Sequence, residues 1–153
     1  MTKRTHTRHV SLYKTPEESP GYLLWRVSMR WRNAIEKTLK TFNLTHPQFV
    51  VLATLSWLTK DGDVVSQIEV GRLAGLDPNT TSQIIRGLEA KQFVTRIVSS
   101  IDERSKNPMI TRQGNDVLAQ ALPTIEHVDD VFFAVLKEVE LKEVKHIFQK
   151  LMG

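Results

Sequence analysis

Hydrogen-bonding side chains recur at helical spacing between residues 79 and 90. Five of them suit contact with a partner: Asn79, Thr80, Ser82, Gln83 and Arg86. On a helix with 100° per residue, most of this set lies opposite an apolar side that includes Ile84, Ile85 and Leu88. Arginine can bind guanine, asparagine and glutamine can bind adenine, and serine can bind either. The segment is therefore a candidate for reading base edges, and a helix face that meets only water is the alternative.

Two short helices joined by a tight turn would position these side chains. Ser66 and Glu69 have the spacing of a capping box, which predicts the start of one helix, and Gly75 predicts its end. Asp77 as N-cap and Pro78 in the first turn predict the start of the next helix, which carries the five candidates. Such a pair is a helix-turn-helix, whose second helix offers its N-terminal residues to the major groove of DNA.

A charged loop after this pair separates two short segments of strand character. FVTRIV at residues 93–98 is rich in β-branched residues, and PMIT follows at residues 108–111. We therefore expect a two-stranded hairpin, or wing, beside the helix-turn-helix. The tip of such a hairpin can reach the flanking minor groove or the DNA backbone.

The charged residues of the wing divide into contact and structural roles. Arg104 and Lys106 are the cations predicted to touch DNA at the tip, and Arg96 and Arg112 at the base could add phosphate contacts. Phosphate would repel Asp102, so its predicted task is structural: pairing an arginine or closing the turn.

Apolar periodicity predicts helices in most of the remaining chain. The segments are residues 20–42, 47–60, 111–136 and 141–152. Thr45 is a plausible N-cap for the second of these, which is apolar almost all round and should form the buried centre. Pro123 lies inside the third and should kink it slightly. The predicted fold class is mostly α, with a winged helix-turn-helix and a two-stranded β-wing.

Composition narrows the function classes. The 153 residues suit one domain, and the absence of cysteine excludes disulfides and thiolate chemistry, in keeping with a cytoplasmic protein. No run of 18 apolar residues predicts a membrane span, and residues 1–19 form a basic arm without a signal-peptide core. Residues 1–71 carry ten basic and six acidic side chains, residues 72–112 seven and four, and residues 113–153 four and seven. This asymmetry favours a polyanionic partner.

Enzymatic chemistry has little support in the sequence. Glu143 and His146 form a Glu-x-x-His pair, which binds metal when two copies face each other, but the chain holds a single copy. No clustered histidine and carboxylate set, glycine-rich phosphate loop or nucleophile elbow is present. We therefore predict neither a metal site nor a cofactor.

The ordered motifs resemble the MarR family of winged helix-turn-helix regulators. The similarity extends over about residues 20–150, through LTHPQFVVLATL, RLAGLDPNTTSQIIRGLEAKQFVTR, DERSK and ITRQG. Its most specific element is the Asp-x-Arg of Asp102 and Arg104, followed by the Thr-x-x-Gly of Thr111 and Gly114. The chain departs from the family at Gln92, where glycine is usual.

This resemblance implies a homodimer that represses transcription, with residues 20–44 and 113–153 as dimerisation helices and residues 45–112 as the DNA-binding lobe. Recognition helices would occupy successive major grooves of a pseudo-palindrome, and Arg104 would enter a flanking minor groove. A small-molecule effector often binds between the dimerisation helices and the lobe. Candidate lining residues are Trp25, Arg26, Trp31, His46, Phe49 and Trp57. Ordinary core packing is the alternative explanation for these residues.

Two further departures leave other functions open. Glu103 stands where the family often has arginine, and Asn107-Pro108 opens the second wing strand unusually. A winged-helix module that binds protein and has lost DNA binding fits the lowered charge of such a wing. A metal- or substrate-binding helical enzyme is the other alternative, and it depends on the pair Glu143 and His146.

Overall fold

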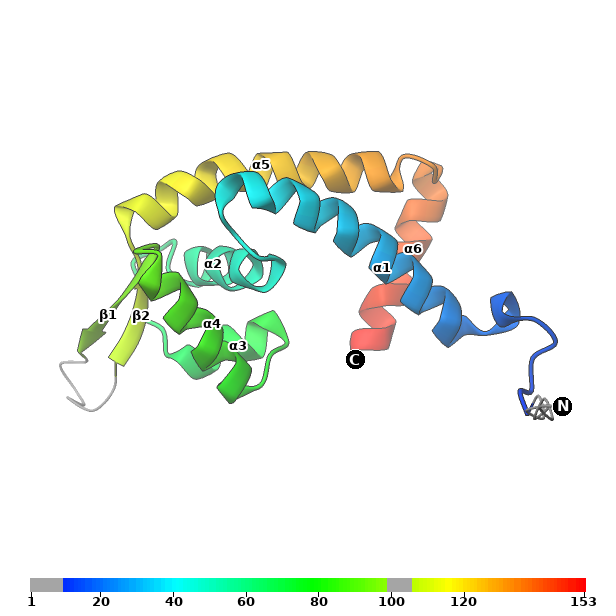
Figure 1. The fold of residues 1–153 in the computed structure, drawn as a ribbon, viewed down its shortest axis with the longest axis horizontal. Coiled ribbons are helices and arrows are strands. Elements are labelled where there is room, and N and C mark those ends of the chain that lie inside the picture. The colour runs from blue at the N-terminus through cyan, green and yellow to red at the C-terminus, as the bar shows by residue number, and fades with distance from the viewer. Residues whose placement is uncertain (1–9, 99–105) are drawn as a thin grey trace, which may run out of the picture. The chain divides into compact units, whose positions relative to one another are not determined.

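A computed structural model describes residues 10–98 and 106–153 of the chain. The elements, in order, are α1 (Pro20–Leu39), α2 (His46–Leu58), α3 (Gln67–Ala74), α4 (Pro78–Ala90), β1 (Val94–Val98), β2 (Lys106–Ile110), α5 (Arg112–Phe133) and α6 (Glu138–Met152) (Figure 1). Short 3-10 turns, Pro16–Glu18 and Lys40–Phe42, flank α1. The mostly helical fold with a two-stranded antiparallel wing confirms the predicted fold class.

The chain divides into two compact units, residues 1–33 and 34–153, with the boundary inside α1. In the first unit, the Arg26 side chain folds back along the helix. Its Nη1 donates a hydrogen bond to the Tyr22 hydroxyl at 2.8 Å, and its guanidinium lies 5.7 Å from the centre of that ring. Within residues 10–98 and 106–153, no helix combines the length and apolar character needed to cross a bilayer.

The second unit is built around α2, which contacts α3, α4, α5 and β2. Its buried side chains are Phe49, Val51, Leu52 and Leu55. Figure 1 shows α2, α3 and α4 gathered beside the first half of α5, with the hairpin next to them. The prediction of a central apolar helix is confirmed, except that Trp57 near its end is 64% exposed and stacks under the Lys60 ammonium.

Four helices begin at side-chain caps. The hydroxyl or carboxylate oxygens of Thr45, Ser66, Asp77 and Thr111 each accept a hydrogen bond from the backbone N–H three residues later. In the capping box of α3, the Ser66 backbone N–H donates to the Glu69 carboxylate at 2.7 Å and is the main cause of its lowered pKa. Local side-chain chemistry therefore sets where these helices start.

The turn from α4 into the wing closes through a left-handed residue. The Phe93 N–H donates to the Leu88 carbonyl at 3.0 Å, and the Gln92 N–H donates to the Glu89 carbonyl at 2.9 Å. These two hydrogen bonds form a Schellman motif, in which Gln92 has φ of +62°. Glycine, which is usual at this position in the family, would adopt this conformation without steric cost. Glutamine adopts it at a steric cost, because its Cβ approaches the following carbonyl oxygen.

Pro108 fits the wing because of its register. It lies opposite Arg96 in the antiparallel ladder. The Thr111 N–H donates to the Phe93 carbonyl, and hydrogen-bonded pairs alternate along such a ladder. Counting from Phe93 and Thr111, the pair of Arg96 and Pro108 is a non-hydrogen-bonded one. The missing N–H of proline therefore costs no ladder bond, and the outer edge of β2 loses one donor that another strand could use.

The start of α5 is fixed against the turn that leads into the wing. The Thr111 hydroxyl donates to the Gln92 carbonyl at 2.6 Å and accepts from the Gly114 N–H at 3.0 Å. A Cβ at residue 114 would overlap the carbonyl oxygen of Phe93 and would lie 2.9 Å from the Ile110 side chain. The Thr-x-x-Gly motif thus joins the long helix to both ends of the hairpin.

Candidate nucleic-acid interface

The helix-turn-helix is held by close contact between its two helices. Gly75 turns the chain in the left-handed conformation, with φ of +68°, between α3 and α4. The fully buried hydroxyl of Thr81 donates to the Asp77 carbonyl at 2.8 Å. A Cβ on Gly71 of α3 would lie 2.5 Å from that hydroxyl oxygen. Glycine at residue 71 therefore allows α3 to approach α4 closely enough to fix its orientation.

Helix α4 presents a polar face to solvent. Thr81, Ile85 and Leu88 are buried on its inner side. Asn79, Gln83 and Arg86, three of the five candidates for base contact, are exposed on the opposite side. The division into two faces matches the sequence prediction, and the role of the exposed side chains in base recognition stays a prediction.

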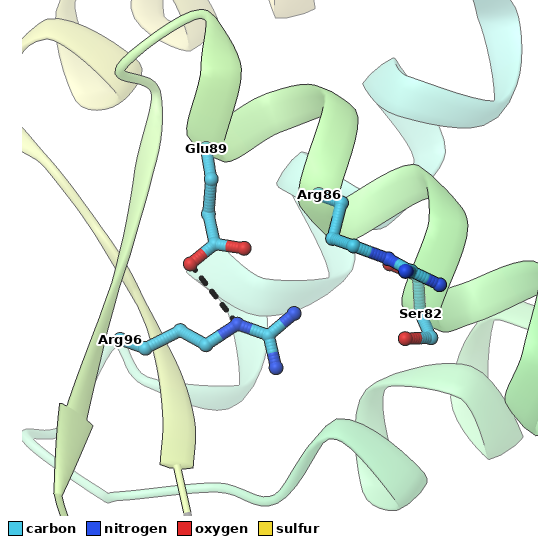
Figure 2. Close-up of polar contacts among 4 residues, drawn as sticks. All are labelled: Ser82, Arg86, Glu89 and Arg96. Atoms are coloured by element: carbon cyan, nitrogen blue, oxygen red, sulfur yellow. Dashed lines mark hydrogen bonds and ion pairs between the residues drawn. The ribbon is translucent and has the colours of Figure 1, made fainter.

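The side chains of two of the five candidates, Thr80 and Arg86, already make hydrogen bonds at the start of α4 or within it. Both the backbone N–H and the hydroxyl of Thr80 donate to the Asp77 carboxylate, and the hydroxyl is the main cause of the lowered Asp77 pKa. Thr80 therefore serves the helix cap as well as the surface. The backbone carbonyl of Ser82 accepts a long hydrogen bond of 3.4 Å from Arg86 Nε. Figure 2 shows the Arg86 side chain lying along α4 toward Ser82.

An ion pair connects the recognition helix to the wing. Arg96 Nε of β1 donates to Glu89 Oε1 of α4 at 3.0 Å (Figure 2), and the two side chains are 23% and 30% exposed. The sequence suggested a phosphate contact for Arg96 but no role for Glu89. The two residues are seven positions apart across the α4–β1 turn, and their proximity depends on how the hairpin packs.

A second polar link joins the end of α4 to the loop before α2. Lys91 Nζ donates to the backbone carbonyl of Asn43 at 2.7 Å and to Gln48 Oε1 at 2.8 Å. The same Gln48 oxygen accepts from the Thr45 backbone N–H at 3.2 Å. A Cβ on Gly87 would lie 2.9 Å from Gln48 Nε2, so the amide packs directly on α4. These contacts hold the end of α4 against the loop before α2.

The predicted contact residues of the wing tip are only partly covered by the structure. Asp102, Glu103 and Arg104 lie outside the described residues, so their predicted roles stay predictions. Lys106 opens β2. Arg112 is exposed at the first position of α5.

The candidate effector-pocket residues fall in both compact units. Trp25, Arg26 and Trp31 belong to residues 1–33, and the other three belong to residues 34–153. In the second unit Phe49 is a core residue, which fits the alternative of ordinary core packing. His46 is half-buried and Trp57 is exposed. Trp25 is also exposed.

Helix α6 leaves most of its apolar residues exposed. None of its residues is buried, although Val139, Ile147, Leu151 and Met152 are all apolar and exposed. A cleft of about 610 Å³ lies between α5 and α6, with apolar walls that include Phe133 and Phe148. Glu126, Asp129 and Asp130 line it too, so the cleft carries acidic groups beside its apolar surface.

No group of three or more potential metal ligands forms among residues 10–98 and 106–153. Glu143 and His146 are both exposed on α6. Within the described part of the chain, Glu143 and His146 therefore belong to no cluster of three metal ligands, and the structure adds no support for a metal-binding enzyme.

Together, the short helix pair, the exposed polar face of α4 and the hairpin define a winged helix-turn-helix protein. A model of the ArnR1-like winged-helix domain matches residues 40–131. The Bacillus subtilis helix-turn-helix transcriptional regulator YdcH is 32% identical over 130 residues, or 85% of this chain and 88% of the relative. The transcriptional repressor Rv2887 of Mycobacterium tuberculosis is 30% identical over 131 residues, or 86% and 91%. The chain belongs to the MarR family of transcriptional regulators, which are not enzymes.

Solved structures show the same architecture. BpsR of Bordetella bronchiseptica superimposes with a TM-score of 0.82 at 24% identity, covering 94% of this chain and 99% of BpsR. Rv2887 in complex with DNA gives a TM-score of 0.66 at 27% identity, covering 88% and 98%. Rv2887 has also been solved with p-aminosalicylic acid. The MarR resemblance drawn from the motifs is thereby confirmed.

Proposed function

We propose that this protein is a cytoplasmic repressor that binds a pseudo-palindromic operator as a homodimer and is released by a small-molecule effector. The observation that carries the proposal is the exposed polar face of α4, with Asn79, Gln83 and Arg86 outward and an apolar face buried behind them. These side chains match the hydrogen-bond patterns of guanine and adenine in the major groove. Arg96 would add a backbone contact, and Arg104 would enter the minor groove.

A homodimer is supported by the apolar surface of α6. An amphipathic helix normally buries its apolar stripe, yet Ile147 and Leu151 are 51% and 73% exposed in the single chain. A second copy of the chain would cover this surface. Two copies would also present two α4 helices to DNA, about 34 Å apart if they occupy successive major grooves.

Release by an effector is supported by relatives. The structure of Rv2887 in complex with p-aminosalicylic acid is 28% identical in sequence to this chain. An aromatic carboxylate is therefore the first class of effector to test here, with salicylate as probe. A ligand releases DNA only if it binds the DNA-free conformation better. Complete switching, from 1:99 to 99:1, would require about 5.5 kcal/mol of differential affinity.

Fluorescence anisotropy tests the DNA-binding part of the proposal. The probes are the duplex upstream of this protein's own gene and a scrambled duplex of equal length, each at two salt concentrations. A specific regulator should bind the first duplex more tightly, and salt should weaken the binding. Equal, weak binding to both duplexes, and to a pool of random duplexes, would instead favour the protein-interaction module.

A further inference from the structure

Glu89 is the only acidic residue within α4, the helix expected to lie against DNA. DNA phosphates repel a carboxylate at this place, and this repulsion weakens binding. A compensating role for the Glu89 carboxylate would depend on its contacts. Its Oε1 accepts a hydrogen bond from Arg96 Nε at 3.0 Å. The structure therefore gives this carboxylate a specific partner in the wing.

Arg96 is held on the inner side of the hairpin. It shares a face of the ladder with Val94, which is 3% exposed, and it lies opposite the buried Pro108. Side chains in a non-hydrogen-bonded pair approach closely, so the Arg96 stem and the Pro108 ring lie side by side. The aliphatic part of Arg96 is thus restrained by packing and its Nε by Glu89.

Among residues 10–98 and 106–153, Glu89 is the one hydrogen-bonding partner of the Arg96 guanidinium. Arginine has five N–H donors in a planar fork, of which the Nε–H faces Glu89. In Figure 2 one terminal nitrogen of Arg96 points away from the Glu89 carboxylate, and the other points to the side. A guanidinium fixed at one edge loses less side-chain freedom when its other edge binds an anion.

We infer that Glu89 is a positioning residue, which holds Arg96 so that its terminal nitrogens bind a phosphate of the DNA backbone. This inference rests on the proposed DNA-binding function. Glu89, an acidic residue of the recognition helix, would then raise the affinity for DNA. Its negative charge alone would lower that affinity.

Three variants separate positioning from charge. Glu89→Met removes the acceptor and the charge at similar size, Glu89→Gln keeps an acceptor oxygen and removes the charge, and Asp116→Asn removes an exposed charge on α5. Positioning predicts that Glu89→Met binds operator DNA about three- to tenfold more weakly, with a salt slope lower by about 0.9 as one phosphate contact is lost. Glu89→Gln should bind as tightly as the wild type or more tightly, and Asp116→Asn should show no loss.

The background of Arg96→Met provides the decisive control. If Glu89 acts through Arg96, adding Glu89→Met to Arg96→Met should cause no further loss of affinity. Tighter binding by Glu89→Met and Glu89→Gln alike would show that Glu89 acts only as a charge, and would overturn the inference. So would a loss that persists without Arg96 or leaves the salt slope unchanged, because that pattern marks general damage to the fold. A wild-type protein that binds no duplex would overturn the proposed function and this inference with it.

Discussion

Gly114, in the first turn of α5, packs directly against the backbone carbonyl of Phe93, at the entry to the wing. The contact involves backbone on both sides, so neither partner can move aside as a flexible side chain would. The long helix therefore receives its position from the same turn that ends the recognition helix. A change at this contact should be transmitted to both elements.

Replacing Gly114 with alanine should destabilise the fold strongly. The added methyl group would overlap the Phe93 carbonyl oxygen, and we expect the free energy of unfolding to fall by about 3 kcal/mol, the upper end of the usual cost of overpacking. Urea unfolding measures this change. Gly21→Ala is the matched control, since its methyl group meets nothing closer than 4.0 Å. Equal effects of the two variants would contradict the role assigned to the contact.

Gln92→Gly should stabilise the protein. Gln92 has φ of +62° and its side chain is exposed, so glycine removes backbone strain and little packing. The greater freedom of glycine in the unfolded chain offsets part of the gain, which leaves a net increase of about 1 kcal/mol. Urea unfolding tests this value, and a loss of stability would show that the Gln92 side chain makes a contribution larger than the strain.

Acid should weaken the N-terminal end of α4 through Asp77. Hydrogen bonds from Thr80 lower the pKa of the Asp77 carboxyl. A lowered pKa in the folded state gives stability that is present above the unfolded value of about 3.9 and is lost as pH falls through the folded value. Asp77→Asn keeps an acceptor but does not titrate. The stability advantage of the wild type over this variant should shrink as pH falls from about 5 to 2, and an advantage that is independent of pH would argue against this account.

Ile147→Glu should separate the proposed homodimer into monomers. Ile147 is 51% exposed on the apolar side of α6, where a carboxylate would be buried without a partner in a dimer. Sedimentation velocity at micromolar concentration would detect the smaller species. Gln149→Glu, in the same helix, adds the same charge at an exposed polar position and should leave the dimer intact. A wild-type protein that sediments as a monomer would refute the proposed assembly.

Base recognition and backbone contact should respond differently to mutation. Gln83→Ala in the recognition helix should relax the preference for one base pair of the operator and cost about 1–3 kcal/mol on the best site. Arg104→Ala in the wing should weaken binding to specific and unrelated duplexes and flatten the salt dependence. Anisotropy titrations with matched and single-substituted duplexes distinguish the two patterns. An unchanged salt slope for Arg104→Ala would contradict the role of the wing.

Helix starts could be predicted from sequence because their signals are local. Thr45, Ser66, Asp77 and Thr111 each cap a helix by bonding a backbone group three residues away, so neighbouring residues contain the whole interaction. The unusual Gln92 was also visible, because it replaces a family glycine at the position that proves to be left-handed.

Contacts between distant elements could not be predicted in the same way. Lys91 reaches the Asn43 carbonyl across 48 positions, and Glu89 meets Arg96 only after the hairpin folds onto α4. The amphipathic pattern of α6 predicted an apolar face, but only the structure shows that none of the residues of α6 is buried within the described part of the chain.

Selection from a random duplex library tests the central claim most directly, because every possible operator sequence competes in the same experiment. If two α4 helices read DNA as a symmetric pair, the enriched sequences should contain an inverted repeat whose half-sites are centred about 10 base pairs apart. The same selection with Gln83→Ala should lose information within each half-site and keep the spacing. Failure to enrich any sequence, or enrichment of single sites without symmetry, would contradict the account.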